Sequence, residues 1–230
     1  MSTLTAHSAE AAAGDAGAFT PIADYGLLAD CNSSALVDRA GSIDWLCLPR
    51  YDSDAIFARL LDPDAGHWSI RPSGPFTTER RYLPGTLVIE TTFTTDTGTF
   101  RLTDAMAFAE GQRGHDLGYA APHEVLRGVE GVSGEVELVM ELTLRPEYGL
   151  IMPLIRLDDG GARTFGSGRV SVRSAVPLGV ADATMRAAFT LREGERLGFS
   201  LRWASPEARD APQPTPAERV MERIDDTVEA

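Results

Sequence analysis

The segment with the most chemically useful side chains is residues 44–54 (DWLCLPRYDSD). Trp45 and Tyr51 lie there beside Arg50, Asp52 and Asp54. Aromatic rings stack on the apolar faces of sugars, while arginine and aspartate form hydrogen bonds with hydroxyl groups. The segment is therefore a candidate sugar-contact surface. Composition alone favours a different interpretation, in which a strand ends here with a core tryptophan and a structural Arg–Asp pair.

Acidic residues are abundant, but the sequence does not show a catalytic pair. A glycosidase needs two carboxyl groups at a defined separation across the sugar, whereas the 34 acidic residues of this chain are by default solvated at its surface. The four histidines lack the spacing of a metal site; they are His7, His67, His115 and His123. Neither a nucleotide-binding motif nor a nucleophile elbow is visible. We therefore expect no metal, no cofactor and no catalytic residue in these 230 residues.

The charge of the chain argues against two classes of partner. The net charge is −13, from 34 acidic and 21 basic residues, and every basic residue is arginine. Nucleic acids and anionic membranes both require a basic surface. No apolar run of about 18 residues occurs, and residues 1–20 lack the basic and apolar parts of a secretory signal. The expectation is a cytoplasmic protein without nucleic-acid or membrane partners, for which neutral ligands such as sugars remain open.

Two cysteines, Cys31 and Cys47, are too few for a secreted disulfide scaffold, so reduced thiols are expected. Their relation depends on a predicted hairpin, in which residues 35–37 and 43–48 flank a turn that contains glycine. A three-residue loop over 38–40 places Cys31 opposite Cys47, whereas a two-residue loop over 40–41 places it opposite Arg50. Only the first register permits a disulfide between the two.

The hydrophobic pattern predicts a mainly β fold. Short β-branched or alternating segments separated by glycine, proline and aspartate occur at residues 67–71, 86–95, 99–107, 124–132, 135–144, 169–176, 183–191 and 197–203. The alternation over 135–142 (EVELVMEL) indicates a strand that is solvated on one face. Many short strands with few helices favour antiparallel sheets packed as a β-sandwich. One short helix is expected near 54–61, where Ile56, Phe57, Leu60 and Leu61 share a face.

The two ends of the chain differ from this pattern. Residues 1–18 are rich in alanine, glycine, serine and threonine without an apolar period, which predicts a disordered tail. The sandwich domain is expected over 19–208, followed over 209–230 by a proline-rich linker and a helix that opens with a capping box. Val220, Ile224 and Val228 form the apolar stripe of this helix. The helix either packs back on the sandwich or has no partner in this chain.

Residues 20–205 also carry a series of longer motifs. They are residues 21–31 (PIADYGLLADC), 41–53 (GSIDWLCLPRYDS), 81–88 (RYLPGTLV), 103–106 (TDAM), 123–127 (HEVLR) and 145–149 (RPEYG). In this order they resemble the N-terminal domain of bacterial trehalase-like and glucoamylase-like enzymes of glycoside hydrolase family 15. Two positions depart from that pattern: Tyr51 stands where phenylalanine is commoner, and Gly128 where a second arginine is usual.

The resemblance implies a large β-sandwich of the super-sandwich type that precedes an (α/α)6 barrel. In that family the barrel carries both catalytic glutamates and hydrolyses α-glucosidic bonds with inversion. The resemblance thus implies that this chain is a non-catalytic N-terminal domain, that its partner is the barrel, and that the α-glucoside binds there. Residues 209–230 would lead to the barrel, which favours a C-terminal helix without a partner in this chain. Residues 45–54 would border the domain interface or the substrate entrance. The alternative is a stand-alone carbohydrate-binding or scaffold module.

Overall fold

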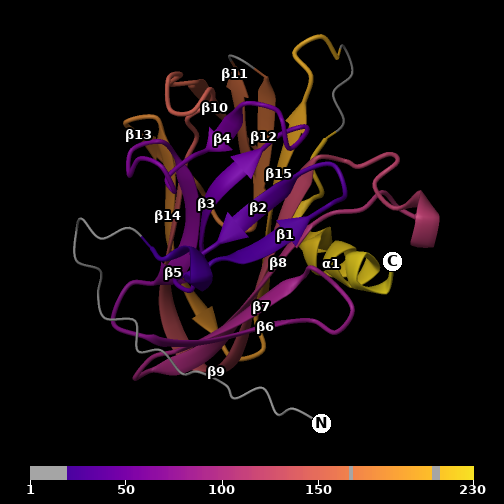
Figure 1. The fold of residues 1–230 in the computed structure, drawn as a ribbon. Helices are drawn as coiled ribbons and strands as arrows, with labels where there is room; N and C mark the ends of the chain where they lie inside the picture. The colour runs from indigo at the N-terminus through magenta and orange to yellow at the C-terminus, as the bar shows by residue number, and fades with distance from the viewer. Residues whose placement is uncertain (1–19, 166–167, 209–212) are drawn as a thin grey trace.

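The computed structural model describes residues 20–165, 168–208 and 213–230, so the predicted tail (1–18) and most of the predicted linker lie outside the described residues. The described residues contain fifteen β-strands in two layers and one α-helix (Figure 1). The first layer contains β1 (Gly26–Ala29), β2 (Ser34–Val37), β3 (Ser42–Cys47), β4 (Ala55–Phe57), β5 (His67–Pro72), β13 (Gly179–Ala181) and β14 (Thr184–Arg192). The second contains β6 (Thr77–Tyr82), β7 (Ile89–Thr94), β8 (Gly98–Met106), β10 (Leu154–Asp158), β11 (Gly161–Phe165), β12 (Arg169–Ser174) and β15 (Arg196–Ala204). The remaining elements are β9 (Glu124–Thr143), α1 (Val220–Glu229) and the 3-10 turns Ile22–Asp24, Gly114–Asp116 and Ala217–Arg219.

Strand β9 joins the two layers because it is long enough to take part in both. Its first half pairs with β8 and β15, and its second half pairs with β5 and β14. Between the halves, Gly134 has a φ of +66°, which residues with a side chain rarely adopt. The sequence predicted two separate strands here, whereas the structure has one bent strand that changes layer.

All strand pairs are antiparallel. The first layer has the order β1-β2-β3-β5-β9-β14-β13, with β4 beside β3. The second layer has the order β6-β7-β8-β9-β15-β12-β11-β10. The predicted antiparallel β-sandwich is confirmed.

The hydrophobic core lies between the layers. Side chains from both sides are inaccessible to solvent, among them Trp68 and Leu142 from the first layer and Phe100 and Phe199 from the second. The alternation predicted over 135–142 is confirmed, since its even-numbered residues are buried and its odd-numbered residues are not. Complete burial of a large apolar side chain contributes roughly 1.5–3 kcal/mol to folding, so this interface is the main source of stability.

The prediction of a helix near residues 54–61 is wrong. Ala55–Phe57 form the short strand β4, which pairs with β3 so that Phe57 lies opposite Leu46. All three residues of β4 are buried, while Leu61, at the end of the predicted apolar face, is 61% exposed. The apolar spacing is compatible with one face of a helix. A surface helix buries only one face, so it would not bury three successive residues, whereas the pairing with β3 buries all three. Tertiary pairing has overridden the local pattern.

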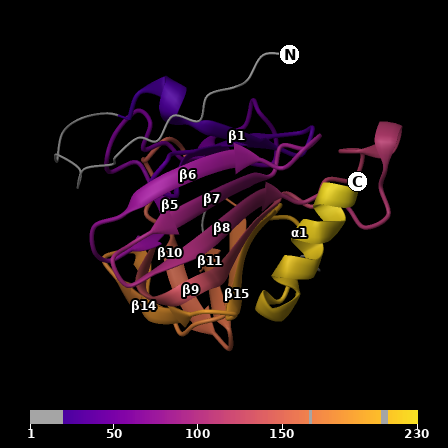
Figure 2. The same cartoon turned by 90° about the horizontal axis from the view of Figure 1, so that it is seen from below.

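Helix α1 packs on the outer face of the second layer, beside β8, β9 and β15 (Figure 2). Val220 and Ile224 are buried in a small apolar cluster that includes Ala105 and Leu126. The helix therefore packs back on the sandwich, and the expectation that it lacks a partner in this chain is wrong because the sheet supplies its own apolar patch. No helix within the described ranges has the length and apolar character needed to cross a membrane.

Two glycines permit this close packing. A Cβ atom on Gly198 would collide with the carbonyl oxygen of Ala217 and with Val220, and one on Gly128 would collide with Met221 of α1. An added side chain at such a contact forces the neighbours apart. Gly128 is the position at which the resemblance leads one to expect a second arginine, and such a side chain would collide with Met221 where α1 lies in this chain.

Both cysteines are unpaired, Cys31 at the surface and Cys47 in the interior. Strand β2 pairs with β3 so that Ala35 lies opposite Leu46. This part of the hairpin has the register expected for the two-residue loop, but a bulge after Leu36 places Val37 opposite Ile43, so neither predicted loop forms as drawn. The register that would place Cys31 opposite Cys47 is therefore absent, and the two thiols are not bonded.

Candidate functional site

The predicted sugar-contact residues lie mainly on the loop that connects β3 to β4, which begins with a cis Leu48–Pro49 peptide bond. The Nε of Arg50 donates a hydrogen bond to Oδ1 of Asp52 at 2.9 Å, and the two side chains are 69% and 72% exposed. This hydrogen bond lowers the pKa of Asp52. Because an exposed ion pair contributes little to stability, both groups are available to a ligand or to another surface.

The two aromatic residues of the prediction point to different neighbours. Trp45 lies on β3, half-buried, with its ring centroid 6.3 Å from that of Tyr148. Tyr51 is 57% exposed and instead borders an apolar groove, together with Leu117 and the end of α1. The structure therefore does not combine Trp45 and Tyr51 into one aromatic platform.

Asp54 is exposed at the end of the same loop. Burial, together with the charge of Asp54, raises the pKa of the Cys47 thiol, so Cys47 is an unreactive interior thiol. Of the five predicted residues, Arg50 and Asp52 are the two that form an ion pair with each other. The loop is a projecting, charged surface rather than a cleft already shaped around a sugar.

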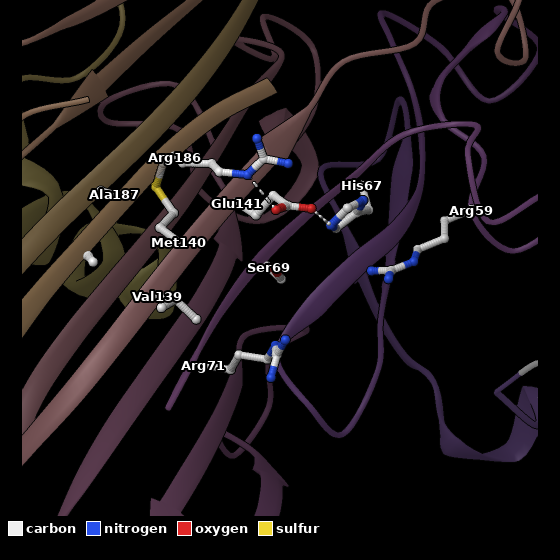
Figure 3. A pocket seen from close by; sticks show the side chains of 10 residues that line it. Arg59, His67, Ser69, Arg71, Val139, Met140, Glu141, Arg186 and Ala187 are labelled. Atoms are coloured by element: carbon white, nitrogen blue, oxygen red, sulfur yellow. Dashed lines mark hydrogen bonds and ion pairs between the residues drawn. The ribbon is translucent and has the colours of Figure 1, made fainter. Parts of the chain in front are cut away.

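A polar pocket that the sequence analysis missed lies on the outer face of the first layer (Figure 3). It has a volume of about 410 Å³ and extends across β5, β9 and β14. Ser69, Glu141 and Arg186 lie opposite one another on these three strands. In the adjacent row, Arg71 lies opposite Val139, which lies opposite an alanine of β14. The small side chains of Val139 and of this alanine leave the face hollow between the longer side chains.

Glu141 is held between two basic side chains, as Figure 3 shows. The Nε of Arg186 donates a hydrogen bond to Oε2 of Glu141 at 2.8 Å, and Nε2 of His67 lies 3.4 Å from Oε1. Burial, aided by the charges of Arg59, Arg71 and Arg186, lowers the pKa of His67 to about 4 although Glu141 opposes this. His67 is therefore neutral at pH 7, and three arginines face a single carboxylate in the pocket.

Neither of these concave regions holds the groups of a glycosidase. Hydrolysis by the usual mechanism needs two carboxyl groups across the sugar, but Glu141 is the single acidic residue that lines the polar pocket. The apolar groove beside Tyr51 has no acidic side chain in its lining. Among the described residues, no group of three or more histidine, cysteine, aspartate or glutamate side chains is placed to hold a metal ion.

The polar pocket had a partial signal in the sequence. Along β5, polar His67, Ser69 and Arg71 alternate with buried Trp68 and Ile70, which indicates one solvated face. The alternation cannot show that β5 and β14 both flank β9, because strand order is a long-range property. The residues were recognisable as the polar face of one strand, but their convergence with residues of β9 and β14 was not.

Two of the sequence motifs meet in the core as a buried ion pair. The Nε of Arg127 donates to Oδ1 of Asp104 at 2.7 Å, and neither side chain is exposed. The remaining guanidinium nitrogens of Arg127 donate to the carbonyl oxygens of Trp68 at 2.6 Å and Gly41 at 2.8 Å. Burial raises the pKa of Asp104, an effect that the charge of Arg127 opposes. The pair links the second layer to the first, so these motifs have an architectural role.

Comparison with known proteins assigns the fold to a family. Residues 13–178, well over half of the chain, match the family described as "Trehalase-like, N-terminal". The chain belongs to the trehalase-like N-terminal domain family. This confirms the resemblance drawn from the motifs, and the β-sandwich is the fold of the trehalase-like domain in this chain.

The curated relatives of this trehalase-like domain are longer than it is. It is 33% identical over 232 residues to a trehalase of Mycolicibacterium smegmatis, a match that covers 92% of this chain and 34% of that protein. It is 42% identical over 132 residues to a trehalase of Mycobacterium tuberculosis, which covers 53% of this chain and 19% of that protein. It is 35% identical over 137 residues to trehalase 1 of Sulfolobus acidocaldarius, a match that covers 59% of this chain and 22% of that protein. The chain thus spans about a third or less of the length of these relatives.

Proposed function

We propose that this trehalase-like domain is the non-catalytic N-terminal part of a longer hydrolase that acts on trehalose or a related α-glucoside. The observation that carries the proposal is the match to the M. smegmatis trehalase, which covers 92% of this chain but 34% of that protein. In the proposed arrangement, the sandwich of residues 19–208 packs on a catalytic (α/α)6 barrel of the family 15 type, and residues 209–230 lead toward it. The unpaired Cys31 and Cys47 are compatible with a reducing, cytoplasmic location.

The distribution of carboxyl groups supports a non-catalytic role. The one carboxylate of the polar pocket, Glu141, is bound by Arg186, and the buried Asp104 is bound by Arg127. A glycosidase acid must exchange protons at the glycosidic oxygen while a second carboxylate acts across the sugar. Groups that are held in ion pairs, without a second carboxylate across an open pocket, are not suited to these two tasks.

The loop of residues 48–54 is the part of this domain that we propose borders the catalytic portion. Arg50 and Asp52 are exposed and pair only with each other, and Tyr51 beside them borders the apolar groove. Ala230, at the end of α1, lines the same groove. A chain that continued from α1 would therefore start next to this loop, which favours contact between the loop and the following domain.

A chimeric enzyme tests the proposal. This chain replaces the matched N-terminal third of the M. smegmatis trehalase, and the release of glucose from trehalose is compared with that of the same relative lacking its N-terminal third. We expect the chimera to fold and to hydrolyse trehalose, and the truncated protein to lose activity because its barrel is left with an uncovered interface. A truncated protein as active as the intact relative would contradict a role for this domain.

The loop is tested within the same chimera. Arg50→Ala and Asp52→Ala should lower kcat/KM for trehalose without changing the unfolding midpoint of the isolated domain, since both side chains are exposed. Arg192→Ala is the matched control, because Arg192 forms a similarly exposed ion pair with Glu135 far along β14. Equal kcat/KM values for all three variants and the unsubstituted chimera would remove the loop from the proposal.

A further inference from the structure

The polar pocket on the outer face of β5, β9 and β14 has a charge opposite to that of the protein. The chain carries a net charge of −13, yet this pocket is lined by Arg59, Arg71 and Arg186 with Glu141 as its one acidic residue. The nearby His67 is neutral at pH 7 because burial and the three guanidinium groups lower its pKa. Because Arg59 also lies 3.8 Å from the carboxylate of Asp44, the local excess is the one positive charge by which Arg71 and Arg186 outnumber Glu141. A positive patch in an acidic protein is a site where an anion is attracted.

The donors of this pocket are not all used within the protein. Arg71 forms no ion pair or hydrogen bond with any other described residue, and its side chain is exposed at the mouth of the pocket. The Nε of Arg186 is occupied by Glu141, which leaves its terminal nitrogens free to donate. Arg59 is already engaged, since it donates to the hydroxyl of Ser42 at 3.3 Å and lies 3.8 Å from the carboxylate of Asp44. Guanidinium groups with unused N–H donors bind carboxylate and phosphate oxygens strongly.

A second and independent feature points to a ligand, namely the hydroxyl group of Ser69. Ser69 is only 6% exposed, and it lines the pocket in the row of Glu141, next to the row of Arg71 (Figure 3). Its hydroxyl has no hydrogen-bond partner among the described residues. Since Ser69 lines the pocket and its hydroxyl is unused within the described residues, a ligand oxygen in the pocket can accept a hydrogen bond from it.

We propose that this pocket binds a small, doubly charged tetrahedral oxyanion, either free phosphate or the phosphoryl group of a sugar phosphate. Arg71 and Arg186 contact its oxygens from two sides, and Ser69 donates from the floor. The volume of about 410 Å³ exceeds what a phosphate group needs, which leaves room for an attached sugar. Glu141 holds Arg186 in place and, by its own charge, disfavours ligands that approach its side of the pocket.

The experiment is a calorimetric titration of the purified chain with inorganic phosphate, sulfate, glucose 6-phosphate and glucose, at low and at physiological salt. We expect saturable binding of the three anions and none of glucose. Comparable affinities for phosphate and glucose 6-phosphate identify a free oxyanion as the ligand, and clearly tighter binding of glucose 6-phosphate identifies a sugar phosphate. Absence of saturable binding of every anion, or binding of glucose as tight as that of glucose 6-phosphate, overturns the proposal.

Substitutions assign the binding to this pocket. Arg71→Gln should weaken anion binding about tenfold without changing the unfolding midpoint, since Arg71 has no partner to lose. Ser69→Ala should also weaken it, through the loss of one donor. Arg192→Gln, on the same strand as Arg186 but paired with Glu135 outside the pocket, removes the same charge and should leave affinity within about twofold. Equal losses for Arg71→Gln and Arg192→Gln would show a general charge effect and refute the assignment.

Discussion

Replacing Arg127 by methionine removes the charge that balances Asp104 in the interior of the sandwich. Arg127 donates to Asp104 at 2.7 Å and to the carbonyl oxygens of Trp68 and Gly41 at 2.6 and 2.8 Å, and neither side chain of the ion pair is exposed. Methionine retains much of the side-chain volume but none of these donors. Breaking a buried ion pair by removing one partner costs about 3–5 kcal/mol, which is a large share of the stability of a domain.

The assay is urea unfolding of the chain and of three variants. Arg127→Met should lower the free energy of unfolding by about 3–5 kcal/mol. Arg192→Met, which breaks the exposed pair with Glu135, should lower it by less than about 1 kcal/mol. The double variant Arg127→Met with Asp104→Leu should recover part of the loss, because it leaves no uncompensated charge in the core.

The pH dependence gives a second test of the same explanation. Burial already raises the pKa of Asp104, and Arg127 opposes that effect, so the pKa in the Arg127→Met variant rises further. A carboxyl group whose pKa is higher in the folded than in the unfolded state destabilises the fold as pH rises above its unfolded value, near 4. The difference in the free energy of unfolding between the unsubstituted chain and Arg127→Met should therefore be largest at neutral pH and shrink toward pH 4. A loss of free energy of unfolding no larger than that of Arg192→Met, or a loss that is constant with pH, would refute the reasoning.

Three other predictions concern the helix, the histidine and the loop. Ile224→Ala should cost about 2–4 kcal/mol, because Ile224 is buried under α1, and should expose the helix to trypsin; an unchanged digestion rate would contradict the observed packing. The pKa of His67 is lowered to about 4, below its unfolded value, so stability falls as pH falls through 6.5 toward 4. Relative to His67→Gln, the unsubstituted chain should therefore lose about 2 kcal/mol between pH 7.5 and pH 5 in urea unfolding, and parallel profiles would refute this. Arg50→Ala should leave the urea midpoint of the isolated domain unchanged, and a marked decrease would mean that the exposed Arg50–Asp52 pair is structural.

Local patterns in the sequence were sufficient for the fold class and for most strands. The alternation over 135–142 places its apolar residues in the core because strand side chains alternate between faces with a period of two. The same local logic failed over 54–61, where the apolar spacing fits a helix but β4 pairs with β3. The local pattern also predicted two strands in place of β9, because a glycine between two apolar runs is typical of a turn. In the structure Gly134 bends the strand without ending it.

The site was harder to predict because it depends on contacts between distant parts of the chain. Ser69, Glu141 and Arg186 come together only because β5 and β14 both pair with β9, which no local pattern encodes. The predicted loop residues were found at the surface, but Trp45 and Tyr51 have different neighbours. In both places the residue types could be recognised from the sequence, whereas their convergence is set by strand order.

The most direct test of the central claim, that this domain does not itself carry the hydrolytic chemistry, is the release of glucose from trehalose by the purified 230-residue chain. The M. smegmatis trehalase serves as the positive control. We predict no release above the rate in buffer, since no pair of carboxyl groups faces either pocket described above. Sustained release that scales with the concentration of the chain, and that is abolished by Glu141→Gln, would contradict the account.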